Sequence, residues 1–426
     1  MPSKLYEPVH MIVLTGGPCS GKSTSLAYLT EKLSDHGFMV AVIPETATMI
    51  TNNGINRHIM DRMGQILVYQ EAIVDIQLAM EETYKTAMEK AFPNRKKILL
   101  LDRGVMDTKA YLPKKEWEGI LAKKRLSEIN LRDRYSGVIH LLTAADGAAE
   151  HYSREGNPAR LENTVEDAIA ADRRTRNAWL GHRRFVVIDN QTGFDEKIKR
   201  TLNIILHHLG YPVPVGREKR YLVKSVDFDA MPERQKVDIE QTYLTSRSPG
   251  QEVRLKRRGQ HGACMYFIVR RDLAAGKGRG YPREEEEIIS EHEYRKFLNM
   301  KNSRLEPVLK ERVCFVWNNS HYELDLYKGR NEGLAILETG FMGQNAPLPA
   351  FLQIGDEITG NNDYSGKALA AKKATGGRHK SPGKKDNIVE LQPRDPGKEK
   401  VKNETKISED RAGADIVDAE AFKIGL

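Results

Sequence analysis

The chain reads Met11-Ile12-Val13-Leu14 and, one residue later, Gly16-Gly17-Pro18-Cys19-Ser20-Gly21-Lys22-Ser23-Thr24. The spacing Gly-x4-Gly-Lys-Ser after an apolar run is typical of a loop whose backbone N–H groups surround a phosphate. Lys22 adds an ammonium group, and Ser23 offers a hydroxyl for Mg²⁺ at a helix N-terminus. The helix itself is predicted from Leu26, Leu29 and Leu33, which recur at helical spacing before Gly37. This stretch therefore predicts an α/β domain that binds a nucleotide.

Length and composition set wider limits. A chain of 426 residues is too long for one ordinary core, so we expect two domains and a tail. No apolar run approaches the ~18 residues that cross a bilayer, and residues 1–10 lack the apolar core of a signal peptide. The three cysteines are far apart in sequence and show no metal-ligand spacing. We expect a cytoplasmic protein.

The positive charge is concentrated near the C-terminus. The formal net charge is +8, and residues 371–402 alone hold ten Lys or Arg against four Asp or Glu. With its glycines and prolines, this composition predicts a disordered basic tail over residues 373–426, which could end in a short helix over 416–426. Such a tail either keeps the chain soluble or contacts anionic lipid in a peripheral membrane association. Nucleic acid is disfavoured, because no basic patch is interleaved with aromatic residues.

Residues 8–212 alternate short apolar runs with helical stretches. Strands are predicted at residues 38–43, 98–101, 138–142 and 185–188, after the first one before the glycine-rich loop. The stretch 57–92 has few helix breakers and is predicted to form one or two long helices. This alternation predicts a parallel sheet with helices on both faces, ending at a Pro-rich linker over 211–216.

Acidic and basic residues follow two of these strands. Glu45 follows the second strand, and Asp102-Arg103 follows the third, at the carboxyl ends where open parallel sheets bind ligands. Asp102 would hold Mg²⁺ directly or through water, and Arg103 would clamp a phosphate. Glu45 would either support the metal or act as the base for an acceptor hydroxyl. The plainer interpretation is that such residues cap helices.

Further along, arginines gather in a polar region: Arg154, Arg160, Arg173, Arg174 and Arg176. Arginines of a lid neutralise charge on a transferring phosphoryl group, although a solvated charged helix has the same composition. Asp189-Asn190 follows the last strand and either reads a base edge or turns the chain. Because no Asn-Lys-x-Asp motif is present, the choice between GTP and ATP stays open.

From residue 217 to 372 the hydrophobic period changes to two, as in β-strands. One side of several strands is charged: Glu323 alternates with Asp325, and basic pairs occupy Arg254/Lys256 and Lys310/Arg312. An antiparallel sheet with a solvated outer face gives this alternation without any function. If the strands instead close into a barrel, the charged side chains line a polar lumen.

Both halves resemble known families. The first resembles the AAA-related P-loop kinases that are similar to ribosylnicotinamide and deoxynucleoside kinases, through residues 16–24, Pro44-Glu45-Thr46, Asp102-Arg103 and Ile188-Asp189-Asn190. The second resembles the CYTH domain, the triphosphate-tunnel fold of thiamine triphosphatases and class IV adenylate cyclases. Its motifs are residues 218–223, 241–244, 253–256, 310–312, 322–325 and 356–360. In this order, the two halves resemble the TRPL translocation defect protein family.

The resemblance implies a closed α+β tunnel and a site for a polyanion such as a phosphoinositide or polyphosphate. The residues it assigns to that site are Glu218, Arg220, Arg254, Lys256, Lys310, Arg312, Glu323, Asp325 and Glu338. Triphosphate-tunnel enzymes carry further metal-binding glutamates where this chain has Gly216 and Gly340. The loss of two carboxylates weakens metal binding and leaves the cations to attract phosphates. The acidic run over 284–287 could supply a replacement.

Two functions follow from the sequence. The first is a regulatory protein that binds Mg²⁺ with GTP or ATP in one half and a polyanion in the other, as the resemblance implies for membrane trafficking. The alternative is an enzyme: a kinase for a nucleoside-like or other small hydroxyl compound, with triphosphatase activity in the second half.

Overall fold

The computed structural model describes residues 7–148, 150, 164–213, 215, 218–246, 248, 250–272, 284–340 and 347–371. All of these residues belong to one compact unit, Met1–Glu390. The predictions made for Arg154, Arg160, Gly216 and the tail over 373–426 lie outside the described residues. Among the helices within those ranges, none has both the length and the apolar character that crossing a membrane requires.

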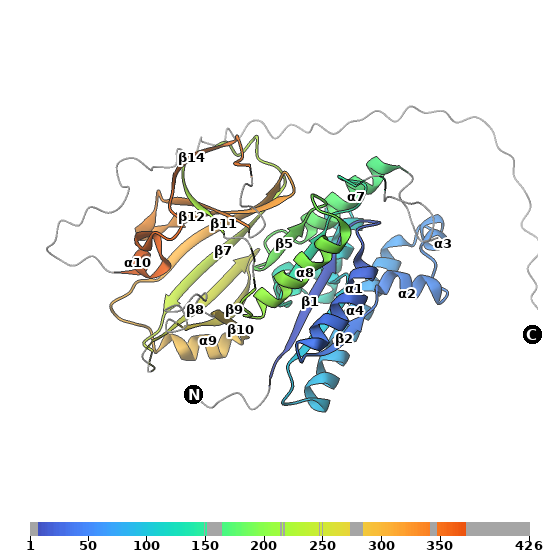
Figure 1. Ribbon diagram of the computed structural model, residues 1–426, viewed down its shortest axis with the longest axis horizontal. Helices are drawn as coiled ribbons and strands as arrows, with labels where there is room; N and C mark the ends of the chain where they lie inside the picture. The colour runs from blue at the N-terminus through green and yellow to red at the C-terminus, as the bar shows by residue number, and fades with distance from the viewer. Residues whose placement is uncertain are drawn as a thin grey trace, which may run out of the picture. The chain divides into compact units, whose positions relative to one another are not determined.

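The first half contains a five-stranded parallel sheet in the order β2-β3-β1-β4-β5 (Figure 1). Its strands are β1 (Val9–Thr15), β2 (Met39–Ile43), β3 (Lys97–Asp102), β4 (Gly137–Leu141) and β5 (Phe185–Ile188). Each predicted strand is present within a residue or two of its expected bounds. The glycine-rich loop follows β1, the central strand, so the loop lies in the middle of the carboxyl edge of the sheet.

Helices cover both faces of this sheet, as predicted. Helices α1 (Lys22–Asp35) and α8 (Phe194–His208) bury their leucines and isoleucines against one face. The other face carries α4 (Ile66–Ala91), the 3₁₀ segment η1 (Val105–Tyr111), α5 (Lys114–Lys124) and α6 (Glu128–Asp133). The remaining helices of this half are α2 (Thr46–Asn52), α3 (Arg57–Arg62) and α7 (Val165–Ala178). The stretch 57–92 forms two helices, since Gly64 turns the chain with φ +66° between α3 and α4.

The second half is a nine-stranded sheet in the order β10-β9-β8-β7-β11-β12-β13-β6-β14, antiparallel throughout. Its strands are β6 (Arg220–Val226), β7 (Arg234–Tyr243), β8 (Gln251–Gln260), β9 (Ala263–Asp272), β10 (Glu284–Ile289), β11 (Val308–Trp317), β12 (Ser320–Lys328), β13 (Ala335–Thr339) and β14 (Leu352–Glu357). Short helical segments accompany them: α9 (Glu291–Leu298), α10 (Gly366–Ala370), η4 (Gly329–Asn331) and η5 (Asn362–Tyr364).

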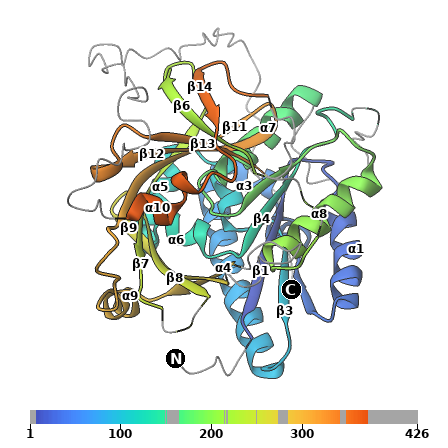
Figure 2. The same ribbon diagram turned by 60° about the vertical axis from the view of Figure 1, so that its left-hand side comes forward.

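The expectation of a closed barrel was wrong for the strands that the structure describes. The sheet curves, as Figure 2 shows, but β10 pairs only with β9 and β14 only with β6. β14 also meets β6 through two register shifts, which interrupt its ladder. Both edges are therefore open, and the charged face is the face of an open, curved sheet.

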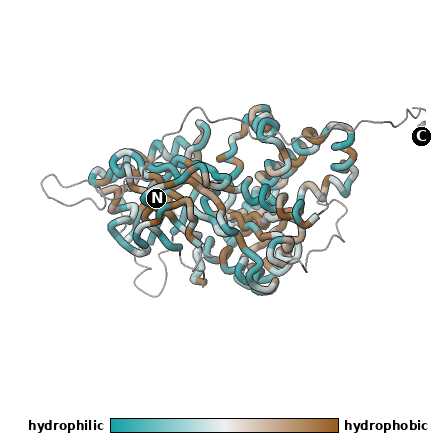
Figure 3. The backbone as a smooth tube through the Cα atoms, turned by 90° about the horizontal axis from the view of Figure 1, so that it is seen from above, coloured by the Kyte–Doolittle hydropathy of each residue, from teal (hydrophilic) through white to brown (hydrophobic). Residues whose placement is uncertain are grey.

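The charged face of the second sheet packs partly against the first half. Ile129 of α6 shares a buried cluster with Val237 and Ile239 of β7, and Val316 of β11 belongs to the core beneath the first sheet. Figure 3 shows hydrophobic residues along the strands and hydrophilic ones along much of the helical periphery. Because buried apolar side chains join the two sheets, the described parts of the two halves form one packed body.

Candidate nucleotide site

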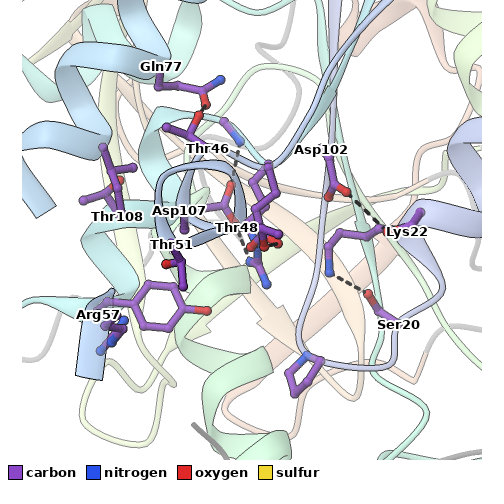
Figure 4. A pocket seen from close by; sticks show the side chains of 18 of the residues that line it. Ser20, Lys22, Thr46, Thr48, Thr51, Arg57, Gln77, Asp102, Asp107 and Thr108 are labelled. Carbon is purple, nitrogen blue, oxygen red and sulfur yellow. Dashed lines mark hydrogen bonds and ion pairs between the residues drawn. The ribbon is translucent and has the colours of Figure 1, made fainter. Parts of the chain in front are cut away.

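A cavity of about 390 Å³ opens at the carboxyl edge of the parallel sheet (Figure 4). It is lined by residues 18–24 of the glycine-rich loop, 45–48 and Thr51 around α2, Arg57, Tyr69, Gln70, Ile73 and Gln77 of α3 and α4, and Asp102, Arg103, Gly104, Asp107, Thr108 and Tyr111 after β3. The sequence motifs at the ends of three neighbouring strands thus meet in one space. The size suits a small ligand.

Two glycines of the loop leave no room for a side chain. A Cβ atom at Gly16, where φ is +146°, would lie 2.2 Å from the carbonyl oxygen of Leu141. At Gly21, where φ is +87°, it would lie 2.3 Å from the Phe194 ring. The loop therefore turns directly beneath β4 and α8, and Gly21 then caps the N-terminus of α1. Because the first N–H groups of a helix have no partner within the helix, those of α1 are suited to bind an anion.

Lys22 folds back over the loop from the first turn of α1. Its Nζ donates hydrogen bonds to the carbonyl oxygens of Gly16 at 3.0 Å and Gly17 at 3.1 Å, and to Ser20 Oγ at 3.2 Å. Burial of the ammonium group and the nearby Arg103 guanidinium lower the pKa of Lys22. This cation therefore lies where a phosphate entering the loop would meet it.

Ser23 and Asp102, which the sequence predicts to hold Mg²⁺, lie within hydrogen-bonding distance of each other. Ser23 Oγ donates to Asp102 Oδ2 over 3.4 Å, and the second carboxylate oxygen, Oδ1, is buried with no hydrogen-bond partner among the described residues. Burial raises the pKa of Asp102, because its negative charge is poorly solvated there. A hydroxyl and a carboxylate are oxygen ligands that Mg²⁺ prefers. The residues present therefore fit a magnesium ion beside the phosphate loop.

Glu45 and Arg103 form an ion pair across the cavity from Lys22. Arg103 Nε donates to Glu45 Oε1 over 2.6 Å, and Thr48 Oγ1 donates to the other carboxylate oxygen over 2.7 Å. Burial acts to raise the pKa of Glu45, but the charges of Arg103 and Lys22 hold it below its ordinary value. Arg103 has φ +70°, a left-handed conformation that is unfavourable for any residue but glycine. Asp107 accepts a second bond from its guanidinium at 3.3 Å.

The cavity lining contains residues of α4 that sequence analysis missed. Gln70 of α4 is 1% exposed and lines the cavity, yet neither its Oε1 nor its Nε2 has a hydrogen-bond partner in the described part of the chain. On the same helix, Gln77 accepts from Thr46 Oγ1 and donates to Glu81 at 2.9 Å. No short motif marks Gln70, because α4 buries Gln77 and Glu81 together with apolar side chains.

Asp172 is a second residue that sequence analysis missed, and it holds the phosphate loop through hydrogen bonds. Asp172 of α7 accepts hydrogen bonds from the N–H groups of Gly17 at 2.7 Å and Thr143 at 3.1 Å. Its other oxygen lies 3.0 Å from His140 Nε2. Burial acts to raise the pKa of Asp172, but His140 and the N–H group of Gly17 hold it below the ordinary value. Since Asp172 lies 155 residues from Gly17, no local motif could reveal the contact.

The other predicted residues of this half lie outside the cavity lining. Arg173 and Arg174 are exposed on α7, whereas Arg176 donates to Asn319 in the second half at 3.0 Å. Asp189 accepts from Arg200 at 2.9 Å. Asn190 donates to the carbonyl oxygens of Thr143 and Asp146, both at 2.7 Å. The contacts of Asp189 and Asn190 connect elements of the fold, and their role toward a nucleotide stays a prediction.

In the second half, the predicted polyanion residues gather on one face but are paired with one another. Arg312 donates to Asp325 at 2.7 Å, to Glu338 at 2.8 Å and to Glu323. Lys310 also donates to Asp325, and Arg220 donates to Glu338 at 3.0 Å. The charges of Arg312 and Lys310 overcome burial and hold the pKa of Asp325 well below its ordinary value. Glu218 lies exposed just before β6.

The acidic run over 284–287 supplies carboxylates to the other cations. Arg254 donates to Glu284 at 2.7 Å, and Lys256 donates to Glu286 at 2.8 Å. Glu284 and Glu286 are therefore the two residues of this run that face Arg254 and Lys256. The alternation in the sequence did not show which pair of glutamates faces these cations. Glu286 also accepts from Arg183 of the first half at 2.6 Å. The N–H group of Gly340 donates a hydrogen bond to the carbonyl oxygen of His321 at 3.0 Å.

One group of possible metal ligands was not visible in the sequence. Single ligand atoms of Cys314, His321 and Glu323 lie within 4.8 Å of one another on β11 and β12. The guanidinium of Arg312 already binds the Glu323 carboxylate, so a cation there would meet a positive charge in direct contact with its ligand. We therefore assign no metal to this cluster.

Comparisons with known proteins agree with a P-loop domain in the first half. Residues 11–197 match the family model described as an AAA domain. No curated protein matches the chain. Among solved structures, the chain is similar to an inorganic triphosphatase (24% identity, 38% of this chain and 98% of that one, TM-score 0.29). It is also similar to a deoxyadenosine kinase from M. mycoides with bound dATP (14% identity, 47% and 100%, TM-score 0.33). Residues 11–197 thus form an AAA-like P-loop domain, and an antiparallel sheet domain follows.

Proposed function

We propose that this chain is a phosphotransferase that moves the γ-phosphoryl group of ATP or GTP to a hydroxyl group of a small nucleoside-like molecule. The observation that supports it best is the continuous cavity, which is lined both by the phosphate loop and by Gln70, whose amide has no hydrogen-bond partner among the described residues. A protein that only binds a nucleotide requires the phosphate loop but no further hydrogen-bonding groups for an acceptor. The lining by Thr51, Tyr69 and Gln70 provides hydrogen-bonding groups for an acceptor besides the nucleotide.

The residues of the loop would bind the donor nucleotide. Backbone N–H groups of residues 19–22 and the Lys22 ammonium would surround the β- and γ-phosphates. The phosphate oxygens would replace the carbonyl oxygens that Lys22 now contacts. Ser23 and Asp102 would hold Mg²⁺, which neutralises negative charge on the phosphate oxygens when bound. The observation that favours this ion is the buried Oδ1 of Asp102, which has no hydrogen-bond partner within the described ranges.

Glu45 and Arg103 would act at the transferred group. In the proposed step the acceptor hydroxyl gives its proton to the Glu45 carboxylate as its oxygen bonds to the γ-phosphorus. The bond from that phosphorus to the bridging oxygen breaks, and its electron pair leaves with the nucleoside diphosphate. The Arg103 guanidinium, 2.6 Å from Glu45, would stabilise the charge on the transferring oxygens.

The Gln70 amide is suited to bind an acceptor molecule with a flat, polar edge. The amide of Gln70 presents one donor and one acceptor side by side, and both lack partners among the residues described. A nucleobase edge has the complementary arrangement. Leaving such a buried amide unpaired costs about 1–3 kcal/mol per group, so occupation by a hydrogen-bonding ligand is expected to be favourable.

The test is acceptor-dependent release of nucleoside diphosphate. Purified protein with ATP or GTP and Mg²⁺ is assayed against a panel of ribonucleosides and deoxynucleosides, and Glu45→Gln is compared with Glu118→Gln, an exposed site on α5. We expect Glu45→Gln to lower kcat by about 100-fold or more without lowering nucleotide affinity, as for a lost general base. Nucleotide binding with no acceptor-dependent turnover across the panel would contradict the proposal.

The second candidate function is the regulatory one, in which the second half binds a phosphoinositide or polyphosphate. The observation that favours it is the gathering of Arg254, Lys256, Lys310 and Arg312 on one face of the sheet. Each has a carboxylate partner, so a polyanion would have to displace Glu or Asp side chains. Membership of the TRPL translocation defect family, a trafficking role and peripheral membrane contact belong to this proposal. Binding of tripolyphosphate and of phosphoinositide vesicles, each compared with Arg254→Gln, tests it.

A further inference from the structure

The turn between β11 and β12 of the second half reaches the first half through one amide side chain. Asn319 Oδ1 accepts a hydrogen bond from Arg176 of α7 at 3.0 Å, and Asn319 Nδ2 donates to Asp146 Oδ2 at 3.3 Å. Asp146 follows β4, and Arg176 lies near the end of α7. One residue of the second half therefore bridges two separate elements of the P-loop domain.

The first of these elements leads to the phosphate loop through α7. Arg176 lies four residues after Asp172, so the two side chains project from the same side of the helix one turn apart. Asp172 is 2% exposed and accepts the N–H of Gly17 at 2.7 Å. A displacement of α7 at Arg176 therefore changes the position of the carboxylate that holds the loop.

The second element leads to the same loop through residues 143–146. Thr143 Oγ1 donates to the carbonyl oxygen of Pro18 at 2.5 Å, and the N–H of Ala144 donates to that of Cys19 at 3.2 Å. The N–H of Thr143 also binds Asp172, so the two routes join. Asp146 completes this short turn, since its N–H donates to the carbonyl oxygen of Thr143.

We propose that Asn319 is a positioning residue through which the second half holds the phosphate loop in its nucleotide-binding conformation. This inference rests on nucleotide binding at that loop, which is part of the proposed function, but it does not require phosphoryl transfer. A preorganised loop binds its ligand more tightly because less conformational freedom is lost on binding. The sheet domain would thereby set nucleotide affinity without touching the nucleotide.

The backbone at this turn allows a clean test. Asn318 and Asn319 both have left-handed backbones, with φ +45° and +57°, which glycine adopts readily. Asn319→Gly therefore removes the bridging amide while keeping the turn. Asn318→Gly is the matched control, because its side chain is exposed at the neighbouring position. Asn319→Asp keeps the acceptor for Arg176 but places a second carboxylate against Asp146, so it separates the two bonds.

Two measurements follow on the full chain: the Kd for Mg-ATP and Mg-GTP, and amide hydrogen exchange of residues 16–19 and 143–146 without nucleotide. We expect Asn319→Gly to raise Kd at least fivefold and to speed exchange in both segments, with β3 unchanged. Asn319→Asp should give an intermediate effect, and Asn318→Gly less than a twofold change. If Asn319→Gly matches its control in both readouts, the inference is wrong even though nucleotide binding stands. A wild-type chain that binds neither nucleotide overturns the inference together with the proposed function.

Discussion

His182 shows how one buried residue makes the fold sensitive to acid. Its Nδ1 accepts from the N–H of Arg184 at 3.1 Å, and its Nε2 lies 3.2 Å from the carbonyl oxygen of Tyr135. These bonds require a neutral imidazole that is protonated on Nε2. Burial lowers the pKa of His182 to about 3, against the opposing charge of Asp133.

The folded chain should therefore lose stability as pH falls from about 6.5 to about 3. In that range the unfolded chain takes up a proton at this position that the folded chain does not bind. One such group contributes a slope of up to about 1.4 kcal/mol per pH unit. We expect His182→Gln to reduce that slope, measured by urea unfolding at pH 7.5, 6.0 and 5.0.

The control is His58→Gln, which changes an exposed histidine on α3. The half-buried His208 and the buried His321 also have lowered pKa values, so they contribute to the pH dependence of the wild-type chain's stability. The informative quantity is the difference in slope between the two variants. Parallel stability curves for His182→Gln and His58→Gln would contradict the assignment.

At the scale of single residues, local motifs were enough to predict which side chains come together in one cavity. Lys22, Ser23, Glu45, Asp102 and Arg103 all follow predicted strands, and parallel strands bring their carboxyl ends to one edge. Gln70 and Asp172 were not predicted as site residues, because both lie inside helices. Their roles depend on how α4 and α7 pack against the loop, which no short spacing encodes.

At the scale of elements, α7 is anchored to the phosphate loop by one carboxylate. Asp172 receives two backbone N–H bonds and faces His140, all of them buried. We expect Asp172→Ala to lower the free energy of unfolding by about 3 kcal/mol, because several buried donors lose their acceptor together. Urea unfolding of the wild-type and Asp172→Ala chains measures this difference in the free energy of unfolding.

Glu166→Ala is the control on the same helix, since Glu166 is exposed in the first turn of α7. Its loss removes only a favourable interaction with the helix dipole, worth about 0.3–1 kcal/mol. Equal destabilisation by the two substitutions would show that Asp172 contributes no more than a surface carboxylate.

The second sheet shows what alternation in a sequence leaves undetermined. The period of two correctly indicated antiparallel strands with one charged face, as in Glu323 and Asp325 on β12. Closure depends instead on whether the two edge strands meet, which is a property of strand number, tilt and register shifts. The shifts between β6 and β14 had no signal in the sequence.

At the scale of the whole molecule, buried charges join the two halves. Arg258 of β8 donates to Asp133 at 2.8 Å, and Arg132 donates to Asp133 at 3.1 Å and to Gln260 at 2.8 Å. Asp133 is 0% exposed. Although burial opposes it, the positive charge of Arg258 and Arg132 lowers the pKa of Asp133 to about 2.

Asp133→Asn should therefore destabilise the chain strongly, since it leaves two buried guanidinium groups without their counter-charge. Breaking a buried ion pair in this way costs about 3–5 kcal/mol. Calorimetry should show a lower Tm, and unfolding should separate into two transitions as the halves uncouple. Asp238→Asn, which breaks an exposed pair with Lys328, is the control and should cost less than about 1 kcal/mol. A single unshifted transition in Asp133→Asn would contradict this account.

The left-handed backbone of Arg103 affects how substitutions at this position change the stability of the protein. A residue with a Cβ atom in that conformation costs roughly 1 kcal/mol or more relative to glycine. Glycine at position 103 would relieve that cost while it removes the guanidinium beside Glu45, whereas alanine would remove the guanidinium and keep the cost. The arginine therefore keeps its ion pairs with Glu45 and Asp107 at the cost of a backbone conformation that only glycine adopts freely.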